Sequence, residues 1–213
     1  MAKFPHSPGV GTLKQLTPTT LMLPAGTRLA RVYYTGSRYA MAWNSFRYTG
    51  PVNARWDHHL PKEGGVPVEQ QRGIYYAASD AKTCLAEFFQ ETRCIDRAYQ
   101  APWLVVFDTE APLLVLDLTG DFVTRMRASM AIHSGTRVRA REWARDLYVA
   151  FENIQGINYA SSMNAGAPAL AINERAVASE IFPARPAFHR ALGDDVMLDP
   201  LKHAALALGY ALR

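Results

Sequence analysis

The sequence has few cysteines and no long apolar run. Its two cysteines among 213 residues, Cys84 and Cys94, lie outside any Cys-x-x-Cys spacing, so we expect reduced thiols, no disulfide and no redox chemistry. No segment approaches the roughly 18 consecutive apolar residues that a membrane-spanning helix requires, and the N-terminal residues lack the apolar core of a secretory signal. These absences predict a soluble cytoplasmic protein that does not contact a membrane.

The short motifs that identify common enzymes are also missing. The sequence contains no phosphate-binding G-x-x-x-x-G-K-[ST], no dinucleotide-binding G-x-G-x-x-G, no zinc-binding H-E-x-x-H and no hydrolase G-x-S-x-G. His58 and His59 are adjacent, a spacing that cannot place both rings on one face of a helix, so we expect no metal ion. The usual nucleotide-binding and hydrolase classes therefore lose their main support.

What is present is the composition of a globular domain. Hydrophobic residues make up 49% and charged residues 20% of the chain, which argues against disorder. A length of 213 residues favours one compact unit with a sizeable core. The residues 1–27, rich in proline and glycine, predict an extended arm laid over that unit, residues 28–213. The net charge of +4 is too small to identify an anionic partner.

Hydrophobic periodicity predicts a mixture of strands and helices. Pro112 separates two apolar runs and predicts that they form a hairpin. The dipeptide Ser79-Asp80 offers N-caps for a helix with one apolar face. Regular β-α-β alternation is lacking, so we expect the α+β class. The expected strands are 29–34, 73–78, 103–107, 113–118, 156–161 and 169–172, and the expected helices are one after residue 80, two within 120–151 separated near Gly135, and one over 201–212.

Five polar residues lie inside apolar strands or beside apolar helix faces, and each has an ordinary explanation. Arg31 in L-A-R-V-Y-Y is equally compatible with a structural salt bridge and with binding of a phosphate or carboxylate, because a buried guanidinium needs an anion or several acceptors. Arg55 beside a tryptophan and an aspartate fits a local ion pair. Tyr76 fits the core, Glu87 a solvated helix face and Ser161 a turn.

Taken in order, these residues reproduce the pattern of the RES domain, which is named for its arginine, glutamate and serine and occurs in toxins of bacterial toxin–antitoxin pairs. Arg31 in L-A-R-V and Arg55 in A-R-W-D match the two arginines of that family. Tyr76 and Glu87 in G-I-Y-Y-A-A-S-D-A-K-T-C-L-A-E match its tyrosine and glutamate. Ser161 in Y-A-S-S, ahead of A-L-A-I-N-E-R-A, matches the serine that precedes a strand ending in F-E-R.

The resemblance extends from about residue 28 to about residue 210, since L-L-V-L-D-L-T-G and R-E-W-A-R-D-L also look like the family. The chain departs from the pattern at Asn173, where the family more often has phenylalanine, and at Ala160, where it often has proline. It also has an insertion-like stretch between Asp57 and Gly73. The five polar positions remain intact.

The resemblance implies a fold and an activity. RES proteins resemble the diphtheria-toxin-like ADP-ribosyltransferases, so a single domain with that fold is expected. They act on NAD as a substrate, by hydrolysis, by phosphorolysis or by transfer of ADP-ribose to a protein. The resemblance also implies a cognate antitoxin with a DNA-binding part, and a protein target is a further expectation. Which acceptor receives the ADP-ribose is left open.

Cleavage of the nicotinamide–ribose bond develops positive charge on the ribose, so a carboxylate is needed beside it. Glu87 is the expected catalytic carboxylate. Arg31 and Arg55 are expected to hold the diphosphate or ribose oxygens with their forked donors. Tyr76 would stack on nicotinamide or seal the pocket, and Ser161 would bind the nicotinamide amide or the ribose. Arg31 and Ser161 are expected, with Glu87, to be the catalytic residues. Further binding candidates are Tyr33 and His58.

The alternative is a binding module without catalytic activity. The helix expected before residue 151 carries Arg137, Arg141 and Arg145 on one face, and such a face binds nucleic acid or an acidic protein in some domains. A solvated helix face explains these arginines equally well. Because no nucleic-acid-binding motif accompanies them, we expect no direct contact of this chain with nucleic acid.

Overall fold

The computed structural model describes residues 4–37 and 40–213, and within them nine strands form one sheet. The strand order is β1-β7-β8-β9-β4-β2-β6-β10, with β3 paired to β4. Neighbouring strands are antiparallel except for β7 and β8, which are parallel. The strands of this sheet are β1 (Thr20–Leu23), β2 (Arg28–Tyr34), β3 (Arg47–Gly50), β4 (Val68–Ala78), β6 (Pro102–Asp108), β7 (Leu113–Asp117), β8 (Gly156–Ala160), β9 (Pro168–Asn173) and β10 (Phe188–Ala191).

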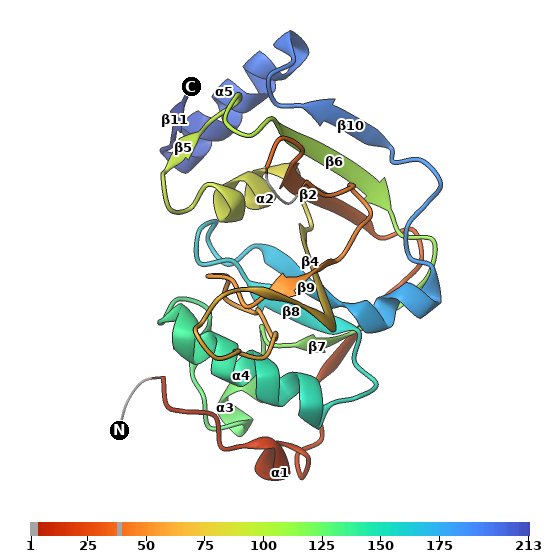
Figure 1. Cartoon of the computed structure of the whole chain (residues 1–213), viewed down its shortest axis with the longest axis vertical. Helices are drawn as coiled ribbons and strands as arrows, with labels where there is room; N and C mark the ends of the chain where they lie inside the picture. Colours follow the sequence, from red (N-terminus) through yellow and green to blue (C-terminus); the bar gives the residue numbers. More distant parts are fainter. Residues whose placement is uncertain (1–3, 38–39) are drawn as a thin grey trace.

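The sheet separates into two parts at the junction of β2 and β4. Both strands lie in the described part of the chain, and they pair at one position, where Ala30 of β2 is opposite Ala78 of β4. By contrast, β2 pairs with β6 along all seven of its residues, and β4 pairs with β9 from Ile74 to Ala78. Figure 1 shows the result, with β2, β6 and β10 in the upper part and β7, β8 and β9 in the lower part.

Helices cover one face of the sheet. Helix α2 packs against β2, β4 and β9, while α4 packs against the lower part of the sheet (Figure 1). Helix α2 starts where expected, because the Asp80 carboxylate accepts a 2.8 Å hydrogen bond from the Thr83 N–H. The helices are α1 (Val10–Leu13), α2 (Ala81–Phe88), α3 (Phe122–Arg125), α4 (Arg137–Ala150) and α5 (Leu198–Leu208), with 3-10 turns at Met130–Ile132, Glu174–Ser179 and Asp195–Met197.

Each face of the sheet has its own apolar core. On the face covered by helices, strand residues such as Ile74 and Leu104 pack with the apolar sides of α2, α4 and α5. On the other face, Tyr75 and Phe107 pack with aromatic residues of loops, including Phe46 and Phe182. Alternate residues of one strand thus enter different cores, because side chains alternate across a sheet.

The predicted hairpin of residues 103–107 and 113–118 is wrong. Both segments are strands, but β6 pairs with β2 and β10, whereas β7 pairs with β1 and β8. Short loops favour pairing of consecutive strands, but here every residue of both segments is buried or partly buried and each strand pairs on both sides with strands from other parts of the chain. The other predicted strands, 29–34, 73–78, 156–161 and 169–172, correspond to β2, β4, β8 and β9, although β4 begins earlier, at Val68. Strands β1, β3 and β10 of the sheet were not predicted.

Near both ends of the chain, the structure contains short helices and strands that the sequence did not predict. The predicted arm includes residues 1–3, which lie outside the described residues. Farther along it, α1 packs on α4, and β1 is an edge strand paired with β7. The last helix ends at Leu208, because Gly209 adopts a φ of 65°, and residues Ala211–Leu212 form a strand, β11, parallel to β5 (Cys94–Ile95).

The chain is therefore one domain with a mixed sheet and helices, consistent with the expected combination of α and β elements. Both cysteines are free thiols, and Cys84 is buried. In the part of the chain that is described, every helix is too short or too polar to cross a bilayer.

Candidate active site

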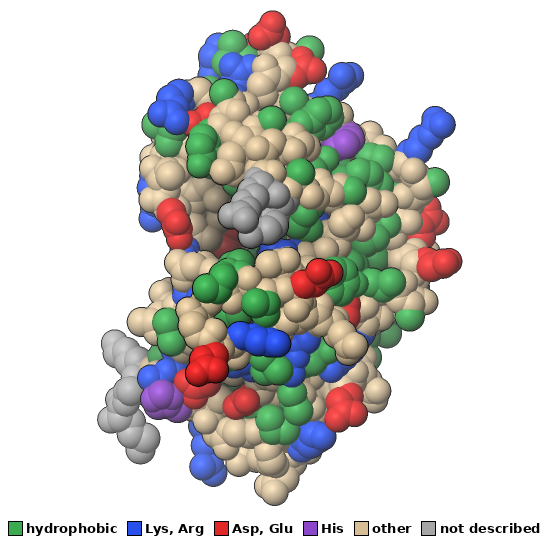
Figure 2. Space-filling model, in the orientation of Figure 1, with side chains coloured by type: hydrophobic (Ala, Val, Ile, Leu, Met, Phe, Trp, Pro, Cys, Tyr) green, Lys and Arg blue, Asp and Glu red, His purple; other side chains and the backbone are tan. Residues whose placement is uncertain are grey.

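A cavity of about 670 Å³ opens where β2 and β4 diverge. Its walls come from β2, β4, α2, the loop 52–55 and the start of α4. Figure 2 shows this face hollowed between the upper and lower parts of the molecule, with acidic and basic side chains at the edge. Because the cavity passes between two strands, residues from both faces of the sheet reach it. The predicted site residues that line it are Arg31, Tyr33, Arg55, Tyr76 and Glu87.

Glu87 lies on α2 and is held by Ser161. The Ser161 hydroxyl donates a 2.5 Å hydrogen bond to Glu87 Oε1 and accepts from the main-chain N–H groups of Met163 and Asn164, both at 3.2 Å. Ser161 is 1% exposed and does not line the cavity. Its hydroxyl is therefore directed at the carboxylate of Glu87 and does not itself line the cavity.

Burial and the neighbouring polar groups shift the pKa of Glu87 in opposite directions. Burial raises the pKa of its carboxyl group, while the hydrogen bond from Ser161 and the charges of Arg55 and Arg137 lower it, and the net shift is upward. A carboxylate in a cleft with a raised pKa and a fixed orientation is typical of catalytic sites.

Arg31 is 7% exposed and has neutral partners in the structure. It donates a 2.9 Å hydrogen bond to the Ser45 carbonyl oxygen, and its guanidinium carbon lies 4.0 Å from the centre of the Tyr75 ring. Neither partner is a carboxylate, so neither cancels the positive charge that Arg31 brings to the cavity. Of the two explanations that the sequence left open, these contacts favour an anionic ligand.

Arg55 lines the cavity from the loop 52–55, which is held by hydrogen bonds of Arg55 and of the neighbouring Asp57. Its guanidinium donates to the carbonyl oxygen of Gly135 at 2.7 Å. Burial lowers the pKa of Arg55, and the charge of Glu87 acts in the opposite direction. The Asp57 carboxylate, which is fully buried, accepts from Arg47 at 2.9 Å, from the Val52 N–H at 2.7 Å and lies 2.5 Å from His59 Nδ1. The local Arg55–Asp57 pair considered from the sequence is replaced by these contacts.

Two tyrosines contribute differently. The Tyr76 hydroxyl is buried and makes no hydrogen bond of normal geometry with the described residues, and burial raises the pKa of this group far above its usual range. The Tyr33 hydroxyl instead lies 2.7 Å from His189 Nε2. Tyr76 therefore presents an unused polar group beside the cavity, whereas Tyr33 contributes mainly its ring.

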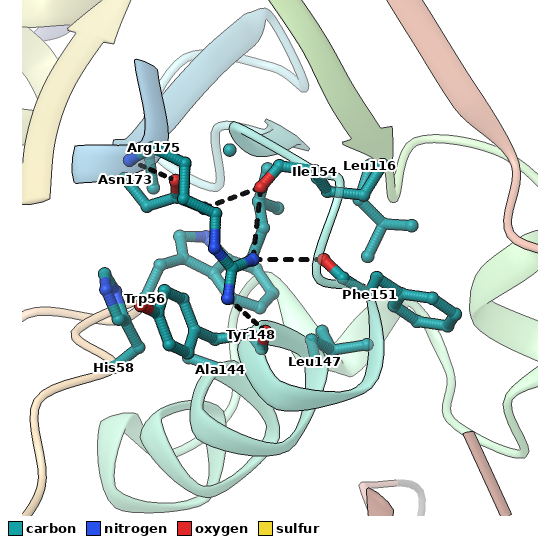
Figure 3. A pocket seen from close by; sticks show the side chains of 13 residues that line it. Trp56, His58, Leu116, Ala144, Leu147, Tyr148, Phe151, Ile154, Asn173 and Arg175 are labelled. Atoms are coloured by element: carbon teal, nitrogen blue, oxygen red, sulfur yellow. Dashed lines mark hydrogen bonds between the residues drawn. The ribbon is translucent and has the colours of Figure 1, made fainter. Parts of the chain in front are cut away.

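His58 lies away from the cavity, in a cluster at the end of α4 that Figure 3 shows. Its ring stacks on Tyr148 with 4.5 Å between ring centres, and its Nε2 lies 3.5 Å from Glu174. Arg175 crosses the other side of the Tyr148 ring and donates to the carbonyl oxygens of Tyr148, Phe151 and Ile154 (Figure 3). These contacts hold the last turn of α4 in place, and His58 takes part in them as a structural residue.

The sequence did not single out several cavity residues. Arg47 and Glu91 lie in segments without a distinctive pattern. Arg137 was considered only as part of a basic helix face. In the structure, Arg137 lines the cavity, and Arg141 donates to the carbonyl oxygen of Val52 at 3.0 Å. These two arginines are thus turned toward the cavity and its loop, which weakens the case for a nucleic-acid-binding face.

The cavity offers donors and cations but no set of metal ligands. Over residues 4–37 and 40–213, no group of three or more His, Cys, Asp or Glu side chains is arranged to hold a metal ion. Its described lining includes four arginines and two glutamates. Such a site suits an organic ligand with a strongly anionic portion.

The mixed sheet, the cavity between its two parts and the serine-held glutamate that faces arginines are the features to compare with known protein families. The RES domain profile matches residues 28–192. The chain belongs to the RES domain family, which confirms the resemblance drawn from the sequence.

Comparison with solved structures supports the fold. A chain in the crystal structure of the M. tuberculosis MbcT–MbcA toxin–antitoxin complex superposes with a TM-score of 0.58 at 13% sequence identity. The match covers 90% of this chain and 96% of that chain. No curated protein sequence matches this chain.

Proposed function

We propose that this protein cleaves the nicotinamide–ribose bond of NAD and acts as the toxin of a toxin–antitoxin pair. The observation that carries the proposal is the position of Glu87, held by Ser161 beside a cavity lined by Arg31, Arg55 and Tyr76. Membership of the RES domain family supports the NAD chemistry. The likeness to a chain of a toxin–antitoxin complex supports a cognate antitoxin, for which a DNA-binding part is the family expectation. A diphtheria-toxin-like ADP-ribosyltransferase fold is part of the same proposal.

Glu87 supplies the charge that the reaction needs. As the bond between ribose C1 and the nicotinamide nitrogen breaks, its electron pair leaves with nicotinamide, and positive charge develops on C1 and the ring oxygen of the ribose. A carboxylate fixed beside that charge stabilises the transition state more than the ground state. An oxygen of the acceptor then bonds to C1 and loses its proton. Water, phosphate and a protein side chain all meet this requirement.

The remaining residues bind and orient the substrate. Arg31 and Arg55 supply forked donors for the dianionic diphosphate or the ribose oxygens. Tyr76 offers an aromatic ring and a buried hydroxyl that a nicotinamide amide is able to satisfy. Ser161 holds Glu87 in place, so its role differs from the direct contact with nicotinamide or ribose that the sequence suggested.

The proposal is tested by nicotinamide release from NAD with purified protein and its Glu87→Gln variant. We expect turnover to fall about 100-fold or more, because one transition-state stabiliser is removed without a change of shape. Glu152→Gln is the matched control, since that carboxylate lies on the surface beside Lys14, and it should leave turnover unchanged. Normal turnover by a folded Glu87→Gln protein contradicts the proposed role.

Thermal melting serves as the check on folding. Since the pKa of Glu87 is raised in the folded protein, its charged form destabilises the fold at a pH above that value. Glu87→Gln should therefore melt at the same or a higher temperature than the parent protein at neutral pH. A large loss of stability would indicate that any loss of turnover comes from unfolding.

A further inference from the structure

The four arginines in the described lining of the cavity differ in the groups that hold them. Arg31, Arg47 and Arg55 each donate to main-chain carbonyl oxygens, which are fixed by the fold. Arg137 is hydrogen-bonded to the side chain of Glu91. Arg47 also binds the Asp57 carboxylate, but that side chain is fully buried. A main-chain or fully buried partner cannot move without distorting the fold, whereas an exposed side chain rotates freely in water. Arg137 is therefore the cavity arginine whose observed partner is readily exchanged.

The Arg137–Glu91 pair belongs to the lining of the cavity and is partly exposed to solvent. Arg137 is the first residue of α4, and Glu91 follows the end of α2. Both line the cavity, yet the side chain of Glu91 is 66% exposed, against 20% for Arg137. An ion pair with one partner so exposed contributes little net free energy, because water screens it. An incoming anion with better geometry is able to displace the Glu91 carboxylate.

The charge of Arg137 also reaches the centre of the site. It lowers the pKa of Glu87 and the pKa of Arg55, so these groups lie within electrostatic range of one another. Arg137 opens a helix of 14 residues, and the partial positive charge of a helix N-terminus lies at the same place. An anion that displaces the Glu91 carboxylate and binds Arg137 would therefore lie close to the reacting groups.

We propose that Arg137 is a further binding residue for the substrate diphosphate and that Glu91 occupies its guanidinium until the diphosphate displaces it. This inference rests on the proposed NAD chemistry and adds the residue that exchanges partners on binding. In the free protein, the Glu91 carboxylate neutralises Arg137. In the complex, the diphosphate takes its place, and Glu91 turns to solvent.

The test compares Arg137→Gln and Glu91→Gln with a matched control, Arg139→Gln. Arg139 lies two residues farther along α4, 3.6 Å from Glu142, and does not line the cavity. The probes are ADP-ribose, which carries the diphosphate, and inorganic pyrophosphate, both measured by calorimetric titration. The Michaelis constant for NAD is measured in parallel, and thermal melting checks each variant for folding.

We expect Arg137→Gln to weaken ADP-ribose binding about tenfold or more, on the scale of losing a hydrogen bond to a charged group. Its effect on KM should exceed its effect on kcat. Glu91→Gln should bind ADP-ribose a few-fold more tightly, because the competing carboxylate is gone. The double variant should resemble Arg137→Gln, and Arg139→Gln should resemble the parent protein.

Three results would overturn the inference. The first is unchanged binding by a folded Arg137→Gln protein, and the second is equal weakening by Glu91→Gln, which marks the ion pair as structural. The third is a parent protein that binds neither ADP-ribose nor pyrophosphate. The readouts also separate this inference from the proposed function. If ADP-ribose binding depends on Arg137 but the protein does not cleave NAD, the proposed function is wrong and the inference about Arg137 stands. If the protein cleaves NAD but binds ADP-ribose equally well without Arg137, the inference is wrong and the proposed function stands.

Discussion

Ser161 is hydrogen-bonded to Glu87 and influences the pKa of its carboxyl group. The Ser161 hydroxyl donates to the carboxylate at 2.5 Å, and this hydrogen bond lowers the pKa of Glu87 against the larger effect of burial. The proposed reaction needs the carboxylate in its charged form. Activity should therefore decrease as pH falls through the raised pKa of Glu87, at a higher pH than for an ordinary glutamate, whose pKa is about 4.3.

Ser161→Ala should move this decrease to a still higher pH. The variant loses the hydrogen bond that favours the charged form, so the pKa of Glu87 rises further. NAD cleavage measured from about pH 4 to pH 8.5 should show a greater loss relative to the parent protein in acid than near neutral pH. Ser162→Ala is the matched control, because Ser162 is the exposed neighbour in the sequence. An unchanged pH profile would show that Ser161 does not tune Glu87.

At the scale of an element, helix α4 extends from the cavity to the cluster around Tyr148 and Glu174. Its first residue lies in the cavity, and its last turn is bound by Arg175 through three carbonyl oxygens. Glu174 organises that end of the helix. It accepts from the Tyr148 hydroxyl at 2.5 Å and from the Gly73 N–H at 2.8 Å. Burial alone would raise the pKa of Glu174, but the nearby His58 ring and the hydrogen bonds from Tyr148 and Gly73 outweigh it and lower the pKa to about 2.

Glu174→Gln should reduce the free energy of unfolding at neutral pH by roughly 1–3 kcal/mol, as when a buried hydrogen-bonded charge is removed. A lowered folded-state pKa stabilises the protein above the unfolded pKa, near 4.3, and this contribution is lost as pH falls toward 2. The difference between variant and parent in urea unfolding should therefore shrink below about pH 4. Glu110→Gln, an exposed change, provides the control. A difference that does not vary with pH would contradict this explanation.

For the molecule as a whole, the site depends on the separation of the sheet into two parts. Pairing of β2 with β4 at a single position leaves room for a cavity between strands that would otherwise be joined. Arg31 from one face and Glu87 beyond the other meet in that space. An open cavity at the surface also provides a place where an inhibitor is able to bind. A carboxylate-rich segment would suit it, because burying these arginines unpaired is unfavourable.

Expression of the chain alone in bacteria should therefore arrest growth, since an enzyme that consumes NAD without restraint harms its own cell. Co-expression of the neighbouring gene should relieve the arrest if that gene encodes the antitoxin. Growth curves and total cellular NAD are the measurements, with Glu87→Gln as the inactive comparison. Normal growth despite soluble, active protein would contradict the toxin role, and arrest that survives Glu87→Gln would show that NAD chemistry is not the cause.

The sequence by itself determined the features that depend on local geometry and burial. Periodicity located most strands, Asp80 predicted the start of α2, and the order of Arg31, Arg55, Glu87 and Ser161 identified the family. The pairing of the strands became known only from the tertiary structure. The same holds for the position of His58, at the end of α4 and away from the cavity, and for the presence of Arg137 and Glu91 in the cavity lining. The reason is that side-chain periodicity records which face of an element is buried, whereas pairing and convergence depend on contacts between residues far apart in the chain.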